Sequence, residues 1–308
     1  MLDSTSKYFE RYNALNQFLK DKFGVKVYKV SLHGFFSCPN RDGTKGLGGC
    51  IYCNPESNLP SRACNKPVKT QLLEGIDGVK KRHHADKFIS YFQHYSNTYS
   101  DAKELRRLYL EALDHPDVVG LAVSTRPDCI NDDALKFLEE LNGKTYLWVE
   151  LGLQSAHDGT LKFLNRHHTI ADFTRAIGRL RASGILTCAH VILGLPGETR
   201  ADMMDTIDFL VAEKIGGIKI HNLHVLKDTP LAKMYAEGAV KTLSLEDYAC
   251  LVVDCLERLP KEVLIHRFNS HSPRWMTVAP EWSINKLGTM NAVHDELLRR
   301  DSWQGKGK

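Results

Sequence analysis

The chain has 308 residues, 43% of them hydrophobic, without a long uncharged apolar run. This composition predicts a globular protein with room for a full core, as one large domain or two average ones, and gives no sign of membrane association. Its 41 basic and 37 acidic residues leave a formal charge of +4, too small an excess to indicate nucleic-acid binding by itself. Because the first residues are polar and carry no secretion signal, we expect a cytoplasmic protein, in which structural disulfides are rare.

Helical and strand patterns alternate along most of the chain. Apolar residues at helical spacing open the sequence, and the continuous apolar run at 118–124 is typical of a buried parallel strand. The predicted helices lie near 6–22, 69–82, 101–113, 131–141, 170–182, 200–213, 244–259 and 290–300. The predicted strands lie at 26–32, 87–93, 118–124, 146–153, 186–193, 217–226 and 263–268.

The first six strands each lead through a loop towards a helix, which predicts parallel strands joined by right-handed crossovers. Six such units are too few to close an eight-stranded barrel. The sequence therefore predicts an α/β fold, either an open, partial (β/α)6 barrel or a doubly wound sheet. We expect an N-terminal helix at 1–24, the barrel at 25–240, a C-terminal α/β extension packed on it at 241–302, and a disordered tail at 303–308.

Polar and glycine-rich segments fall at or just after the C-terminal end of nearly every predicted strand. In parallel (β/α) folds these segments build the active site. After the cysteine-containing loop that follows the first strand, the residues of interest in chain order are Gln93, Ser124, Arg126, Glu150, Gln154, Gly194, Leu195 and His221. We therefore expect one convergent site at one mouth of the sheet.

Two further features leave alternatives open. Along a strand, side chains alternate between faces, so His221 and His224 are expected to point in opposite directions, with at most one facing the barrel interior. His190 on the fifth strand is either a core histidine or a cavity residue. The polar loop at 269–275 either reaches over the mouth of the barrel or serves only as a connector.

Three cysteines, Cys38, Cys50 and Cys53, lie in a loop rich in Gly, Pro, Asn and Asp. Three thiolates can hold three irons of a [4Fe–4S] cluster, which leaves the fourth iron open to a small molecule. Alternatively, Cys64 completes a four-thiolate structural zinc site, and the spacing leaves both readings open. The polar residues at the other strand ends favour the cluster, because a structural zinc site gives no reason for them. The remaining cysteines are expected to be packing residues: Cys129, Cys188, Cys250 and Cys255.

Together these motifs resemble the radical S-adenosylmethionine superfamily, over about residues 25–270. The cysteine loop, with Tyr52 just before its last cysteine, is similar to the cluster loop of that superfamily, although its first spacing exceeds the common Cys-x3-Cys-x2-Cys. Long first gaps occur in the branch that contains the catalytic subunit of Elongator. The segments Ser-Thr-Arg-Pro-Asp, Val-Glu-Leu-Gly-Leu-Gln-Ser, Asn-Arg-His-His-Thr and Gly-Leu-Pro-Gly-Glu-Thr look like that branch, and the whole chain looks most like its short bacterial YhcC-like members.

The resemblance implies an enzyme that binds a [4Fe–4S] cluster on the three cysteines and cleaves S-adenosylmethionine reductively to a 5′-deoxyadenosyl radical. It implies that Tyr52 lies beside the adenine, that Arg126 and Arg166 bind the methionine carboxylate, and that Glu150 and Gln154 hold the ribose hydroxyls or the amino group. Further contacts to S-adenosylmethionine are implied for Gln93, Ser124, Gly194, Leu195 and His221.

The resemblance also implies partners: an electron donor such as flavodoxin or ferredoxin and, more distantly, a tRNA wobble uridine as substrate. The basic runs at 80–84 and 166–168 are either solvated faces or patches that meet phosphates. Two alternatives are the same radical chemistry on a small metabolite or protein side chain, and a zinc-stabilised module without enzymatic activity.

Overall fold

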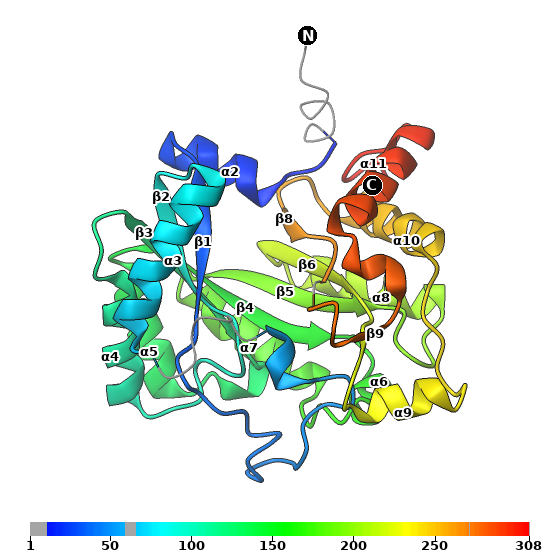
Figure 1. Ribbon diagram of the computed structural model, residues 1–308, viewed down its shortest axis with the longest axis horizontal. Coiled ribbons are helices and arrows are strands. Elements are labelled where there is room, and N and C mark those ends of the chain that lie inside the picture. The colour runs from blue at the N-terminus through cyan, green and yellow to red at the C-terminus, as the bar shows by residue number, and fades with distance from the viewer. Residues whose placement is uncertain (1–10, 59–65, 271, 308) are drawn as a thin grey trace.

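The computed structural model describes residues 11–58, 66–270 and 272–307. Its centre is a seven-stranded parallel sheet in the order β1-β2-β3-β4-β5-β6-β8, curved into a half-barrel (Figure 1). Because every neighbouring pair is parallel, the carboxyl ends of the strands meet at one edge of the sheet. The strands are β1 Val27–Leu32, β2 Lys87–Phe92, β3 Val118–Thr125, β4 Tyr146–Gln154, β5 Leu186–Leu193, β6 Gly217–Asn222 and β8 Leu264–Arg267.

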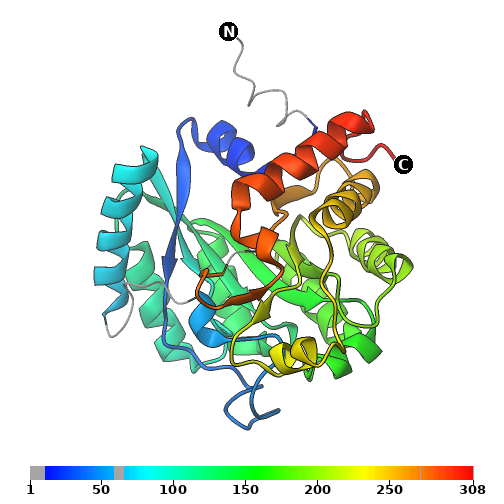
Figure 2. The same cartoon turned by 45° about the vertical axis from the view of Figure 1, so that its right-hand side comes forward.

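Helices cover the outer face of this sheet. Those that follow β1 to β5 are α3 Val68–His83, α4 Ala102–Leu113, α5 Asp132–Asn142, α7 Ile170–Ala182 and α8 Arg200–Ala212. In the C-terminal part, α10 (Leu245–Arg258) contacts both α8 and α11 (Lys286–Arg299), so that the three lie side by side (Figure 2). The shorter helices are α2 Leu15–Phe23, α6 Asp158–Phe163 and α9 Pro230–Ala236. Each helix in the described residues is too short or too polar to cross a membrane.

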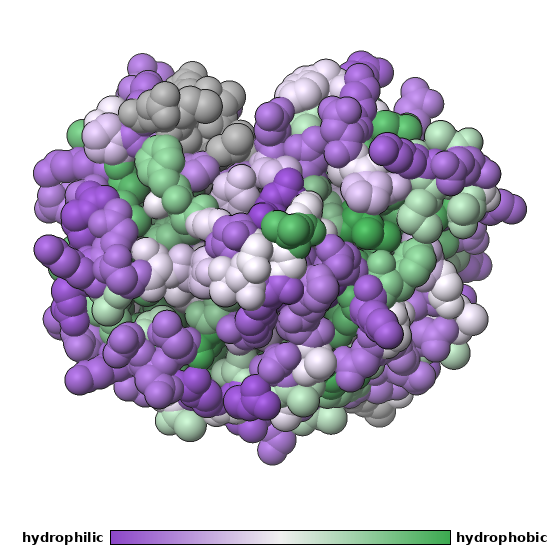
Figure 3. Space-filling view, turned by 90° about the horizontal axis from the view of Figure 1, so that it is seen from below, coloured by the Kyte–Doolittle hydropathy of each residue, from purple (hydrophilic) through white to green (hydrophobic). Residues whose placement is uncertain are grey.

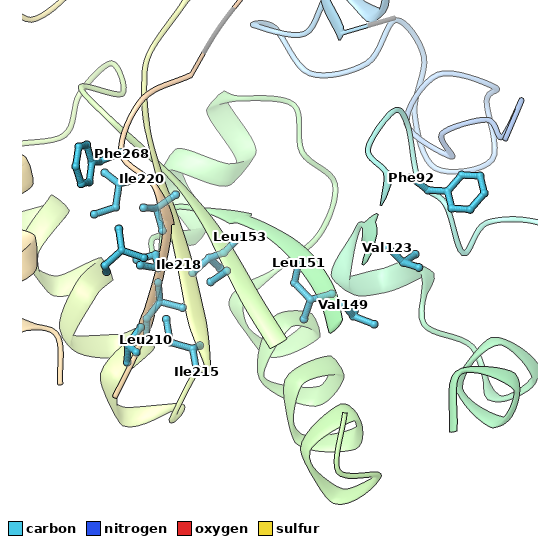
Figure 4. Close-up of a cluster of buried hydrophobic side chains, with 14 of the residues drawn as sticks. Phe92, Val123, Val149, Leu151, Leu153, Leu210, Ile215, Ile218, Ile220 and Phe268 are labelled. Carbon is cyan, nitrogen blue, oxygen red and sulfur yellow. The ribbon is translucent and has the colours of Figure 1, made fainter. Parts of the chain in front are cut away.

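Side-chain alternation along the strands separates the hydrophobic core from the barrel interior. On β4, Val149, Leu151 and Leu153 are fully buried in the cluster that packs against the helices (Figure 4). Trp148 and Glu150, which alternate with these residues along the strand, belong to the opposite, inner face of the half-barrel. Burying each large apolar side chain contributes about 1.5–3 kcal/mol, so the outer layer fixes the sheet while the inner face is left for polar groups.

The prediction of a partial α/β barrel is confirmed, with one more strand than expected. The strand predicted in the extension, β8, pairs with β6 and is the seventh strand of the sheet. The predicted strand at 217–226 is interrupted instead: β6 ends at Asn222, and β7 (Val225–Leu226) pairs antiparallel with β9 (Thr277–Ala279). Of the N-terminal helix expected at 6–22, the part from Leu15 onwards is seen as α2. Residues 11–14 are described but are not helical, and residues 6–10 lie outside the described residues.

The structure corrects the expectation of a disordered tail for residues 303–307. The Gln304 side chain is buried, donates to the carbonyls of Pro260 (2.6 Å) and Val263 (2.9 Å), and accepts from the amide of Asn13 (2.9 Å). The Gly307 amide donates to the Glu257 carbonyl (3.0 Å). Composition alone made this segment look disordered, because a run of Gly and Lys does not show that one glutamine is anchored.

Candidate functional site

A cavity lies at the carboxyl edge of the sheet, where the loops that follow the strands converge. Figure 3 views the molecule from the side on which these loops lie in Figure 1, and hydrophilic side chains predominate there. The described residues that line the cavity include the three cysteines, but none is an aspartate or a glutamate. Its basic lining residues are Arg41, Arg126, Arg166, Arg267, His94, His190, His221 and His224. Its four arginines, without a carboxylate among the described lining residues, make the cavity a cationic environment.

The cysteine loop folds back on itself so that all three thiols face one cavity. The carbonyl of Cys38 accepts from the amides of Arg41 (2.8 Å) and Asp42 (3.2 Å), and the amide of Cys53 donates to the carbonyl of Cys50 (3.0 Å). Gly49 has φ +84°, and a Cβ atom there would lie 2.4 Å from the Arg41 side chain. Glycine thus allows the turn that brings Cys50 back towards Cys38.

Donors surround the buried Cys50 sulfur. Asn40 Nδ2 and Arg166 Nη1 each lie 3.5 Å from Cys50 Sγ. Burial raises the pKa of the Cys53 thiol to about 12, and the neighbouring Cys50 adds to the rise. Three thiols in one enclosed place ionise together only around a cation, and N–H donors to sulfur are typical of iron–sulfur sites.

The donor set fits a [4Fe–4S] cluster held by three thiolates, as the resemblance implied. Cys64, the fourth ligand of the alternative zinc site, lies outside the described residues. Of the other cysteines, Cys129, Cys188 and Cys255 are buried and do not line the cavity.

Two arginines and a glutamine present unpaired polar atoms beside the cysteines. Arg126 binds Asp128 through two N–H groups (2.9 and 3.0 Å), and Arg166 donates to the carbonyl of Gly152 (2.6 Å). Among the described residues, Arg126 Nη1, Arg166 Nε and Gln154 Oε1 are buried without a hydrogen-bond partner. Two guanidinium donors and one amide acceptor suit a carboxylate and an ammonium group, the two ends of an amino acid.

The cavity brings together most of the residues singled out from the sequence. In addition to the cysteines, Arg126, Gln154 and Arg166, it is lined by Tyr52, Gln93, Ser124 and His221. Whether they contact S-adenosylmethionine remains a prediction.

Three predicted contact residues lie elsewhere. Glu150 is fully buried below the cavity, and its carboxylate already accepts hydrogen bonds from other side chains of the barrel interior. Gly194 and Leu195 do not line the cavity, and a Cβ atom on Gly194 would lie 2.9 Å from Leu243. For these three residues the position in the structure argues against direct contact with a ligand. Gly194 and Leu195 were singled out because they follow the fifth strand, and Glu150 because a glutamate in an apolar strand needs a partner. Glu150 finds that partner in other side chains of the barrel interior.

The expectation that at most one of His221 and His224 faces the interior is wrong, because both line the cavity. Alternation applies only within a strand, and β6 ends at Asn222, before His224. The loop at 269–275 reaches the cavity through Ser270 and Ser272, although residue 271 lies outside the described residues. Ser272 Oγ lies 2.8 Å from His224 Nδ1, which joins this loop to the end of the sheet.

The basic runs differ in their positions. In the run at 166–168, Arg166 and His168 are buried, so the run does not form a surface patch. The run at 80–84 lies at the end of α3, where Lys80 pairs with Asp117 (2.9 Å) and Lys81 with Asp77 (2.7 Å). This second run is therefore the solvated end of a helix.

Sequence reasoning missed Arg267, the last residue of β8, which lines the cavity beside His221. Arg267 Nε and Nη2 lie 3.2 and 3.1 Å from His221 Nε2. The rule that found the other strand ends would have found Arg267 too, had its strand been assigned to the sheet. His190, left open from the sequence, lines the cavity and bonds Glu150 (2.9 Å).

Comparison with known proteins gives consistent matches. The model of the Radical SAM superfamily matches residues 39–210, and that of the Radical SAM C-terminal domain matches residues 215–299. The Bacillus subtilis protein YtqA is 42% identical over 301 residues, covering 96% of this chain and 92% of YtqA. Escherichia coli YhcC is 39% identical over 288 residues, covering 93% of this chain and 92% of YhcC. Neither name states a reaction.

Two further matches are more distant. The structure of Elp3 from Methanocaldococcus infernus, with its N-terminus deleted, superposes with a TM-score of 0.70 at 18% identity, covering 90% of this chain and 64% of that one. This likeness concerns the fold alone. A tRNA uridine(34) acetyltransferase from Methanocaldococcus jannaschii is 26% identical over 167 residues, or 52% of this chain and 30% of its own.

Proposed function

The chain belongs to the radical SAM superfamily and is an enzyme of that superfamily, and on this premise we propose that Cys38, Cys50 and Cys53 hold its cluster and that its substrate is a tRNA. One observation supports the cluster site: three cysteines converge on one cavity at the carboxyl edge of the sheet. The described residues that line this cavity include no carboxylate. When bound, the [4Fe–4S] cluster and S-adenosylmethionine supply a one-electron C–S bond cleavage that yields a 5′-deoxyadenosyl radical. A flavodoxin or ferredoxin is the proposed electron donor.

The residues around the cysteines have separate tasks in this proposal. Asn40 and Arg166 donate to the Cys50 sulfur, which steadies the thiolate and withdraws charge from it. Arg126 Nη1 and Arg166 Nε bind the methionine carboxylate, and Gln154 Oε1 accepts from the amino group. The Arg126–Asp128 ion pair, with both side chains buried, holds the guanidinium in place before the ligand arrives.

Apolar side chains on the other side of the cavity exclude water. Ile192, Leu223 and Leu226 line it, and the first two belong to a buried cluster that also contains Leu164 and Leu195. Such a lining limits the access of water, which strengthens the polar interactions within the site and restricts side reactions of a reactive intermediate. Leu195 therefore supports the site through packing.

Two exposed aromatic rings, one of them in the lining of the cavity, support an RNA substrate. Phe35 and Tyr95 are 53% and 36% exposed, and both have left-handed backbone, with φ of 57° and 64°. Bulky side chains rarely adopt this conformation, which costs of order 1–2 kcal/mol. The rings are linked through His33, whose centroid lies 4.7 Å from Phe35 and 6.2 Å from Tyr95. Exposed aromatic rings stack on unpaired bases, as in many RNA-binding proteins.

The distant relative that acts on tRNA uridine also favours tRNA over other substrates. A wobble uridine is the specific site we propose. The direct test compares the nucleosides of tRNA from cells with and without the gene, by liquid chromatography and mass spectrometry. The proposal predicts one nucleoside that is missing or replaced by its precursor in the deletion strain. Identical nucleoside profiles would contradict it and would favour a small metabolite or a protein side chain as the substrate.

A binding measurement complements the genetic comparison. We expect tRNA to bind the cluster-loaded enzyme with an affinity that falls steeply as salt increases. The F35A variant should weaken tRNA binding by about 5- to 100-fold, the range for loss of one stacked base. W303A is the matched control, because Trp303 is 47% exposed but lies in the C-terminal segment, whereas Phe35 packs on His33, which also contacts the cavity-lining Tyr95.

A further inference from the structure

Arg267 differs from Arg126 and Arg166 in having neither a carboxylate nor a cysteine sulfur as a hydrogen-bond partner among the described residues. Arg126 pairs with Asp128, and Arg166 lies against the Cys50 sulfur. Arg41 donates to a carbonyl within the cysteine loop. Arg267 is half-buried at the end of β8, and no carboxylate among the described residues forms an ion pair with it.

The contact between Arg267 and His221 fixes the protonation of the imidazole. A guanidinium has only donors, so His221 Nε2 must accept from Arg267 Nε and Nη2. Burial lowers the pKa of His221 well below its usual range, and the charge of Arg267 lowers it further. The neutral ring then carries its proton on Nδ1. His221 Nδ1 and Arg267 Nη1 are thus two N–H donors at one end of the cavity without a hydrogen-bond partner among the described residues.

The charges behind this pair do not neutralise it. Glu150 is the carboxylate of the barrel interior, and it is occupied by Lys219 and His190. Lys219 lies opposite Arg267 in the register of β6 and β8, so the residue paired with it across the two strands is another basic residue. Holding a guanidinium in a half-buried site without a counter-charge costs free energy that an anionic ligand would offset.

We infer that Arg267 and His221 form a subsite that binds an anionic group, a phosphate or a carboxylate, of the molecule that the enzyme modifies. Arg267 Nη1 and His221 Nδ1 donate to two oxygens of that group, with the planar guanidinium held by the imidazole behind it. Ser270 and Ser272, which line the same cavity from the loop after β8, add hydroxyl groups beside it. The inference rests on the proposed function in one respect, that the cavity receives the substrate.

Binding of simple anions tests the subsite without turnover and without RNA. The anaerobic, cluster-loaded enzyme is first saturated with S-adenosylmethionine, so that the donors beside the cysteines are occupied. Inorganic phosphate and acetate are then titrated separately by calorimetry. We expect one of the two to bind, and R267Q to weaken its binding about 10- to 100-fold. Tighter binding of phosphate assigns a phosphate to the subsite, and tighter binding of acetate assigns a carboxylate.

Two variants keep the test decisive. R267K keeps the charge but loses the planar fork, and it should weaken binding less than R267Q; it also carries the test if R267Q fails to fold. R175Q removes an exposed guanidinium from α7 and should leave anion binding unchanged. Wild-type enzyme that binds neither anion, equal affinities for wild type and R267Q, or an equal loss in R175Q would each overturn the inference. Unchanged tRNA nucleosides in a deletion strain would count against the RNA substrate but leave this result standing.

Discussion

The ion pair between Glu150 and Lys219 in the barrel interior gives a prediction about stability that the structure makes quantitative. Both side chains are almost fully buried, and they form a salt bridge with each other. The Glu150 carboxylate also accepts from Tyr91 (2.6 Å), Trp148 (2.9 Å) and His190 (2.9 Å). The E150Q variant removes the negative charge, so that Lys219 keeps only neutral hydrogen-bond partners such as the Tyr91 hydroxyl (2.6 Å).

Removing one partner of a buried ion pair costs about 3–5 kcal/mol, because the group left behind must either stay buried as an unpaired charge or give up its charge. We expect E150Q and K219M each to lower the free energy of unfolding by that amount, measured by urea denaturation at pH 7. In the double variant E150Q/K219M no charge is left unpaired, so its loss should be smaller than the sum of the two single losses by about 2–3 kcal/mol. Single losses below about 1 kcal/mol, or additive losses, would refute the reasoning.

The pH dependence of stability follows from the same network. Burial raises the pKa of Glu150, but Lys219 and His190 outweigh burial and hold this pKa well below its usual range. Because the folded-state pKa is lower than the unfolded one, the contribution to stability is present above the unfolded pKa and is lost as pH falls through the folded one. E150Q should therefore show a flatter decline of stability in acid than wild type. Parallel acid profiles for the two proteins would contradict this assignment.

Three further predictions concern the turn after β5, the C-terminal segment and the cavity. G194A should lower the free energy of unfolding by about 2–4 kcal/mol in urea denaturation, because Gly194 has φ +82° and the new Cβ would press on Leu243. The control G238A, at φ +76° with open space around it, should lower it by about 1–2 kcal/mol. Equal losses would exclude the contact with Leu243. Q304A removes three hydrogen bonds and should lower the free energy of unfolding by about 2–3 kcal/mol. An unchanged free energy of unfolding would mean that this side chain does not anchor the C-terminal segment. R126Q should weaken the binding of S-adenosylmethionine about 10- to 100-fold in anaerobic equilibrium dialysis. The control R106Q, on the surface of α4, should bind it as wild type does. Unchanged affinity in R126Q would show that Arg126 does not bind the ligand.

The fold was predictable because its signals are local. Alternating helix and strand patterns placed the first six strands of the sheet, with an error only where the strand predicted at 217–226 ends early at Asn222. The short strand β8 was found, but its partner was not, because strand pairing depends on contacts between segments far apart in the sequence. The anchoring of Gln304 by residues near 13 and 260 was hidden for the same reason.

The site was predictable to the extent that strand ends predict it. The cysteines, Arg126 and Gln154 converge as expected, because the carboxyl ends of parallel strands share one edge. Arg166, which the resemblance implied, joins them from the segment after α6. Glu150 was read as a ligand contact because a glutamate in an apolar run needs a partner. The structure supplies that partner from Lys219, some 70 residues away in the chain, which a local pattern cannot reveal.

The central claim, that Cys38, Cys50 and Cys53 hold a cluster that cleaves S-adenosylmethionine, is tested most directly with anaerobically purified protein. We predict a brown protein that contains iron and sulfide and that forms 5′-deoxyadenosine from S-adenosylmethionine when reduced. C53A should lose both the cluster and this product, whereas C250A, a cysteine on α10 away from the cavity, should keep them. A colourless protein that holds one zinc ion, or undiminished 5′-deoxyadenosine formation by C53A, would contradict the claim.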